Sequence, residues 1–223
     1  MNQTSLLRKA VLLFPFLAAL LATYLAAKPL PADQAQLGAQ IVAQGTKNGG
    51  VACARCHGFD GAAEGSGAFP KLTGQSSDYL ESELRAYISG DRKNALMQPI
   101  AKGLNDAEIK AVSQYYATLH GTSALPRAQS SELLARGEQL AKVGDLSIRV
   151  QACESCHGPN GQGNPPTPYL AGQYSQYIAL QIRMYRQGFR KTDQMTDPAQ
   201  NLRDKDIAAV AAYFEQISRP APK

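Results

Sequence analysis

The sequence contains no tryptophan, and aromatic residues of all kinds make up only 7% of its 223 positions. Because large aromatic side chains supply much of the buried area of a core, we expect another group to help fill this one. The chain is 44% hydrophobic and 18% charged, proportions that exclude a disordered tail or a collagen-like repeat. Its length suggests one or two domains.

The sequence also lacks clustered positive charge. The net charge is +5, but Arg8, Lys9 and Lys28 contribute three of those charges near the N-terminus. The remaining excess is spread thinly over the rest of the chain. Since nucleic-acid-binding domains gather Lys and Arg on one face, we expect no nucleic acid among the partners of this protein.

Only one long hydrophobic run is present. Residues 10–27 are uncharged and mostly apolar, and they follow Arg8 and Lys9, which is the layout of a secretory signal. The run reaches the lower limit for a membrane-spanning helix, and it lacks the A-x-A motif at which signals are cleaved. We predict an uncleaved hydrophobic helix in residues 1–32 that anchors the chain to the bacterial inner membrane, with a cleaved signal as the alternative. Either way, the remainder is exported to the periplasmic side.

After this run the sequence repeats itself. The motif C-A-R-C-H-G at residues 53–58 recurs as C-E-S-C-H-G at residues 153–158, and P-x-L-x-G-Q at residues 70–75 recurs at residues 168–173. Self-similarity at a fixed period indicates copies of one structural unit. We predict two modules joined by a short linker, with bounds of 33–122 for the first module, 123–131 for the linker and 132–223 for the second module.

Each module has the periodicity of helices. Near the end of the first one, Ile109, Val112 and Tyr116 recur at the spacing of one helix face, and the second module has the same pattern. A middle helix over residues 77–89 is expected to stop at Gly90. No segment alternates in the manner of a strand, so the predicted fold class is all-α.

All four cysteines lie in two C-x-x-C-H motifs, which consist of Cys53, Cys56 and His57 and of Cys153, Cys156 and His157. Two disulfides, a redox-active thiol pair or one zinc held by four thiolates are alternative interpretations. None of these needs a histidine directly after the second cysteine. Covalent haem attachment does, because the thiols add to the haem vinyl groups and the histidine is thereby directed at the iron. We therefore predict two covalently attached haem c groups, with His57 and His157 as iron ligands.

Methionine supplies the candidates for the second iron ligand. Met97 and Met195 occupy equivalent positions of the repeat, each in an expected loop ahead of the last helix. Such a loop can close over the open face of a haem, although core packing is the alternative for both residues. Met184 aligns with Ala86 in the middle helix and is expected to fill the core. We predict Met97 and Met195 as the second ligands.

Ligation by histidine and methionine leaves no position on the iron open to oxygen, peroxide or substrate, and it suits electron transfer. We therefore predict no catalytic residue. The carbonyls of Pro70 and Pro168 are candidates for orienting the two histidines, with simple turn prolines as the alternative. Four further polar residues are expected on the solvated surface rather than at haem propionates, namely Gln75, Arg92, Gln173 and Arg190.

With these residues in place, the chain resembles the dihaem cytochrome c4 family. The shared features are the two C-x-x-C-H-G motifs, the P-x-L-x-G-Q segments, Met97 and Met195, and paired tyrosines in the middle and closing helices. The resemblance covers roughly residues 36–218. It implies two class I cytochrome c domains related by a pseudo-twofold axis. It also implies a carrier of electrons from a quinol-oxidising cytochrome complex to a terminal haem–copper oxidase, and the absent cleavage motif favours a tethered one.

Other functions remain as alternatives. The nearest is the dihaem electron-accepting subunit of a periplasmic dehydrogenase, such as a flavocytochrome. A dihaem peroxidase would need one iron without a methionine ligand, yet both modules retain one. For a redox sensor we would expect a signalling domain after the second module, and we predict none there.

Overall fold

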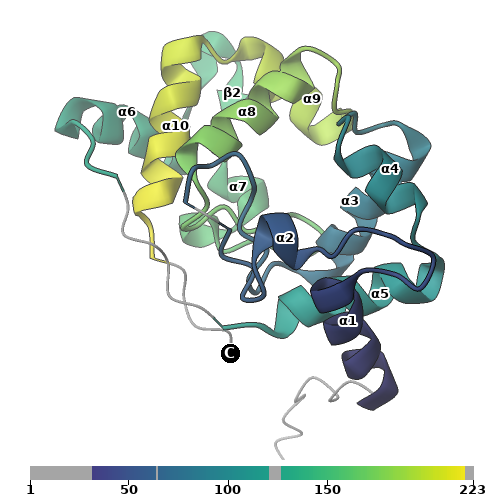
Figure 1. Ribbon diagram of the computed structural model, residues 1–223. Coiled ribbons are helices and arrows are strands. Elements are labelled where there is room, and N and C mark those ends of the chain that lie inside the picture. The colour runs from purple at the N-terminus through teal and green to yellow at the C-terminus, as the bar shows by residue number, and fades with distance from the viewer. Residues whose placement is uncertain (1–31, 64, 121–126, 219–223) are drawn as a thin grey trace, which may run out of the picture. The chain divides into compact units, whose positions relative to one another are not determined.

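The structure is a computed structural model of the chain, and it describes residues 32–63, 65–120 and 127–218 (Figure 1). These ranges belong to one unit of contacts that begins at Pro31. The predicted N-terminal hydrophobic helix and part of the predicted linker lie outside the described residues. Within those ranges, every helix is too short or too polar to cross a membrane.

Helices make up almost all of the regular structure in the described ranges, as predicted. The helices of the first module are α1 (Ala32–Gln44), α2 (Ala54–His57), α3 (Ser77–Ser89), α4 (Met97–Lys102) and α5 (Asp106–Thr118). Those of the second module are α6 (Ser131–Lys142), α7 (Glu154–His157), α8 (Ser175–Arg186), α9 (Asp193–Asn201) and α10 (Asp204–Gln216). The same order of elements therefore occurs twice.

The second module also contains short elements that the sequence pattern does not reveal. Strands β1 (Gly144–Asp145) and β2 (Val150–Gln151) pair antiparallel around a 3-10 turn at Leu146–Ile148, and another 3-10 turn spans Pro159–Gly161. Two-residue strands are too short to show a period of two. The all-α class stands, with this small hairpin as an addition.

The boundaries of α3 follow from the residues at its ends. The hydroxyl of Ser76 accepts a hydrogen bond from the backbone N–H of Tyr79, which caps the first turn. At the other end, Gly90 has a φ of 90°, in the left-handed region that favours glycine. The predicted end of this helix at Gly90 is confirmed.

In each module the first helix packs across the last one, α1 against α5 and α6 against α10 (Figure 1). A glycine stands at both crossings. A Cβ added at Gly38 would lie 2.5 Å from the carbonyl oxygen of Ala111, and one at Gly137 would lie 2.2 Å from that of Ala209. The two backbones approach closely enough to exclude any side chain, so this packing depends on glycine.

Each module has a hydrophobic core of its own, and the two clusters share no residue. In the first module the buried residues include Ile41, Val112 and Tyr116, and Cys53 packs against them. In the second module, Cys153 and Met195 pack against the corresponding cluster. The residues with candidate functions therefore border the cores.

We expect Gly137→Ala to lower the free energy of unfolding by about 1–3 kcal/mol, the usual cost of overpacking. The added methyl group would meet a backbone oxygen, which cannot rotate away. Urea unfolding of the purified protein measures the effect. Gly103→Ala is the control, because its Cβ would find nothing nearer than 3.4 Å and its φ is −81°. Equal unfolding midpoints for the two variants would contradict the role given to the helix crossing.

Candidate functional site

Each C-x-x-C-H motif forms a single helical turn, α2 in the first module and α7 in the second. The backbone N–H of His57 donates to the carbonyl of Cys53 at 3.0 Å, and that of His157 donates to Cys153 at 2.9 Å. Burial raises the pKa of Cys53 to about 11 and that of Cys153 to about 12. Both are therefore neutral thiols at neutral pH.

Two alternative interpretations of the cysteines disagree with the structure. No disulfide joins any of the four cysteines, all of which lie in the described ranges. Among the residues that the structure describes, no three His, Cys, Asp or Glu side chains are grouped in a way that could hold a metal ion. The zinc interpretation, which needs four thiolates around one ion, is therefore contradicted.

Both motif histidines are buried and oriented by a proline carbonyl. His57 is 7% exposed and His157 is 6% exposed. Nδ1 of His57 lies 3.3 Å from the oxygen of Pro70, and Nδ1 of His157 lies 3.0 Å from that of Pro168. Because a carbonyl can only accept, Nδ1 carries the proton and Nε2 keeps its lone pair. This confirms the orienting role predicted for the two prolines.

The electrostatic surroundings keep both imidazoles neutral. Burial lowers the pKa of His57 and of His157, and the positive charge of Arg92 or Arg190 lowers it further. The hydrogen bond to the proline carbonyl opposes this effect without overcoming it. A neutral imidazole with a free Nε2 is the form that binds a metal.

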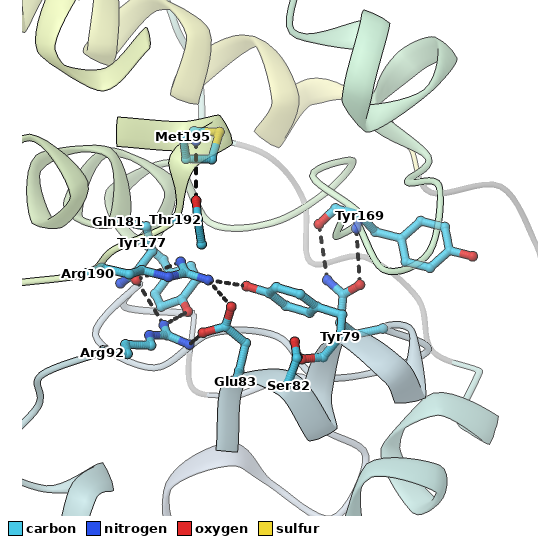
Figure 2. A network of polar contacts seen from close by, with 11 residues as sticks. Tyr79, Ser82, Glu83, Arg92, Tyr169, Tyr177, Gln181, Arg190, Thr192 and Met195 are labelled. Carbon is cyan, nitrogen blue, oxygen red and sulfur yellow. Dashed lines mark hydrogen bonds and ion pairs between the residues drawn. The ribbon is translucent and has the colours of Figure 1, made fainter. Parts of the chain in front are cut away.

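The two candidate methionines lie in short helices rather than in loops. Met97 begins α4, and its N–H donates to the side chain of Asn94 at 2.9 Å. Met195 lies in the first turn of α9, where its N–H donates to the hydroxyl of Thr192 at 3.2 Å (Figure 2). Both methionines are partly buried. The expectation of loops was wrong because Pro99 in α4 and Pro198 in α9 conceal the helices from a search for periodicity.

Four residues expected on the solvated surface are in fact buried. Their exposed fractions are 5% for Gln75, 5% for Arg92, 8% for Gln173 and 5% for Arg190. They become buried because the two modules dock against each other through them. Burial of this kind depends on the contact between two copies, so a helix pattern read within one module does not reveal it.

Two glutamine side chains hold the modules together by pairing with backbone. Nε2 of Gln75 donates to the carbonyl of Tyr169 at 3.1 Å, and the N–H of Tyr169 donates to Oε1 of Gln75 at 3.0 Å. Gln173 makes the same pair of hydrogen bonds with the backbone of Lys71, both at 3.0 Å. Each module therefore contributes one amide to a segment of the other.

Contacts of the two arginines across the interface are reciprocal as well. Nη2 of Arg92 donates to the hydroxyl of Tyr177 at 2.6 Å, and Nη2 of Arg190 donates to that of Tyr79 at 2.8 Å (Figure 2). The backbone of the two arginines forms an antiparallel bridge. Exchange of contacts between equivalent residues is the signature of a twofold relation, and it agrees with the predicted pseudo-twofold axis.

We expect Gln75→Met to lower the free energy of unfolding by about 1–3 kcal/mol, the cost of leaving buried polar groups without their partner. Methionine has a similar volume but offers neither an amide donor nor an amide acceptor. The midpoint of urea unfolding measures the loss. Gln40→Met, at an exposed position of α1, is the matched control. Unfolding of both variants at the wild-type midpoint would contradict this role of Gln75.

Comparison with known proteins identifies the class. The family model for cytochrome c matches residues 35–120 and again residues 134–218. The chain therefore belongs to the cytochrome c family and contains two tandem cytochrome c domains. A chain with two such domains carries two covalently bound haem c groups, each with its iron.

Curated relatives narrow the comparison. The chain is 37% identical over 196 residues to the thiosulfate dehydrogenase electron acceptor of Stutzerimonas stutzeri (strain A1501), covering 83% of this chain and 88% of that protein. It is 33% identical over 180 residues to cytochrome c4 of Azotobacter vinelandii, covering 74% and 84% respectively. The resemblance to cytochrome c4 is thus confirmed, together with a likeness to a dehydrogenase electron acceptor.

Solved structures give the same two likenesses. Reduced recombinant cytochrome c4 from Pseudomonas stutzeri matches with a TM-score of 0.71 and 31% identity, over 82% of this chain and 98% of that one. A thiosulfate dehydrogenase from Marichromatium purpuratum matches with a TM-score of 0.75 and 34% identity, over 82% of this chain but only 40% of that longer one.

The residues present fit two haem groups. Each module offers two thiols in one helical turn beside a neutral imidazole whose Nε2 makes no hydrogen bond within the described part of the chain. At the interface, two buried arginines face one carboxylate, that of Glu83. An uncompensated buried charge is costly, and the propionates of haem are carboxylates that would offset it.

Glu83 and Gln181 are two interface residues that sequence reasoning missed. They lie at equivalent positions of α3 and α8, and both contact the two arginines. A signal was present, because the repeat places an acidic residue in one module opposite a neutral one in the other. This difference between the modules indicates a buried charge only once the position is known to be buried.

Proposed function

We propose that each module binds one haem c through the residues of its own motif and one methionine. The thiols are Cys53 and Cys56 in the first module and Cys153 and Cys156 in the second, and the iron ligands are His57, Met97, His157 and Met195. The observation that carries this proposal is the hydrogen bond from Nδ1 to a proline carbonyl in both modules, which leaves Nε2 available.

The protein would then act as a carrier of single electrons. Haem c supplies reversible one-electron chemistry at its iron. Pro70 and Pro168 hold the imidazoles in one tautomer and orientation. Cys53 and Cys153 pack against the hydrophobic cores of their modules, and Met97 and Met195 would provide the second iron ligands. With both positions filled by protein, electrons are what the site exchanges.

The proposed partners follow from the cytochrome c4 likeness. A quinol-oxidising cytochrome complex would donate electrons, and a terminal haem–copper oxidase would accept them. The protein would then work in a respiratory chain on the periplasmic side of the inner membrane. The hydrophobic segment at residues 10–27 would attach it to that membrane.

A second candidate function is electron acceptor for a periplasmic dehydrogenase. It is favoured by the relative named thiosulfate dehydrogenase electron acceptor. The longer solved thiosulfate dehydrogenase chain, of which this chain covers 40%, supports the same candidate. In this case thiosulfate oxidation would supply the electrons, while the haem-bearing modules would work in the same way.

Replacement of either candidate axial methionine tests the ligand set. We expect Met97→Ala or Met195→Ala to leave one iron with an open position, so that the reduced variant binds one carbon monoxide per chain, whereas the wild type binds almost none. Absorption spectra of the reduced protein with and without carbon monoxide measure this. Met184→Ala is the control, because Met184 lies in α8 outside the proposed ligand set. Stoichiometric binding by the wild type would overturn the carrier function.

The donor can be identified by rapid mixing. We expect the oxidised protein to be reduced within a turnover of the quinol-oxidising complex, and at least tenfold more slowly by a thiosulfate dehydrogenase supplied with thiosulfate. Stopped-flow absorbance at the haem bands measures both rates. The reverse order would assign the protein to the dehydrogenase, and no reduction by either would contradict both donors.

A further inference from the structure

One position of the interface breaks the symmetry between the modules. Glu83 in α3 and Gln181 in α8 are equivalent in the repeat, and their side chains have nearly the same size and shape. One is a carboxylate and the other a neutral amide. Around Arg92 and Arg190, the two modules therefore make matching contacts that differ by one unit of charge.

The contacts made by these two residues are equivalent. Glu83 accepts from Nη1 of Arg92 at 2.6 Å and also from Nη2 of Arg190 (Figure 2). Oε1 of Gln181 accepts from Nη1 of Arg190 at 3.0 Å and from Nη2 of Arg92 at 2.8 Å. Each residue thus binds the arginine of its own module and that of the other. We call these four side chains the interface charge network.

The network is buried and carries a net positive charge. Both arginines are 5% exposed, and the side chain of Glu83 is 14% exposed. Among the protein side chains, two guanidinium groups and one carboxylate leave one positive charge in excess, before the charge of any haem propionate is counted. Because charges interact strongly away from water, this excess acts on neighbouring groups over a longer distance than a surface charge would.

The network lies next to both proposed iron sites. The guanidinium of Arg92 stacks on the ring of Tyr87, and that of Arg190 stacks on the ring of Tyr185. Each guanidinium lies 4.6 Å from the ring centre. Each arginine precedes the proposed methionine ligand of its module by five residues, Arg92 before Met97 and Arg190 before Met195. Along the chain, the segment after Arg190 continues through Thr192 into the helix of Met195 (Figure 2). A change in the charge of the network would therefore change the electrostatic potential at both haem groups.

We propose that the interface charge network sets the reduction potentials of the two haem groups, and that Glu83 is the residue that fixes its charge. Positive charge near an iron favours the addition of an electron and so raises its reduction potential. The carboxylate of Glu83 therefore lowers both potentials. The neutral amide of Gln181 leaves them higher than a second carboxylate at that position would. Glu83 acts through the arginines and is a positioning residue rather than a ligand. This inference rests on the proposed haem ligands but not on the proposed donor or acceptor.

Three variants and the wild type form a series in which only this charge changes. Glu83→Gln raises the net charge of the network by one, and Gln181→Glu lowers it by one. The double variant with both exchanges moves the carboxylate to the other module without changing the net charge. Redox titration of the purified holoproteins, with chemical mediators and no protein partner, gives the two midpoint potentials of each.

We expect the mean potential to decrease in the order Glu83→Gln, wild type, Gln181→Glu. Each step should change the equilibrium constant with an external one-electron couple on the order of tenfold, which is about 59 mV. The double variant should return to the mean potential of the wild type. If Glu83→Gln does not fold, Gln181→Glu and the double variant still decide the outcome, since they retain at least one carboxylate to pair with the arginines.

Asp78→Asn is the matched control, because it removes the same charge from an exposed position of the same helix, and we expect its potentials to stay close to those of the wild type. A purely structural network would change the urea midpoint of the variants and leave the potentials unchanged, which would overturn the proposal. A double variant that keeps the shift of one single variant would overturn it too. Failure of the haem ligands themselves would show separately, as carbon monoxide binding by the wild type.

Discussion

Each module is organised around one buried hydrogen bond, from Nδ1 of the motif histidine to a proline carbonyl. A buried imidazole that is to bind a metal must be neutral and must present a free nitrogen in a fixed direction. The helical turn of the C-x-x-C-H motif supplies the histidine. The P-x-L-x-G-Q segment supplies the carbonyl, and its final glutamine reaches the other module. One short segment therefore orients the histidine and docks the two modules.

Burying charged side chains where the two modules dock costs free energy. Two guanidinium groups are taken out of water, and their Coulombic interaction with one carboxylate does not neutralise them. With haem bound as proposed, their remaining charge would lie near groups whose oxidation state changes by one electron. An arrangement that would merely destabilise an ordinary interface can thus serve a redox protein, because the energy of the buried charge depends on whether the neighbouring iron is oxidised or reduced.

The sequence predicts the parts of this structure that are local or repeated. The C-x-x-C-H motifs, the two modules, the end of α3 at Gly90 and the orienting prolines all depend on spacing within one copy. Short helices α4 and α9 escaped prediction because each contains a proline. The burial of Arg92 and Arg190 escaped it for another reason. Long cationic side chains are usually solvated, and only the contact between the modules removes these two from water.

The central claim is that both motifs carry covalently bound haem, and peptide masses test it most directly. Proteolysis of the purified protein should release one peptide containing Cys53 and Cys56 and another containing Cys153 and Cys156. Each peptide should be heavier than its amino-acid sequence by the mass of one haem, with both thiols consumed. Peptides that carry free thiols or disulfides in either module would contradict it.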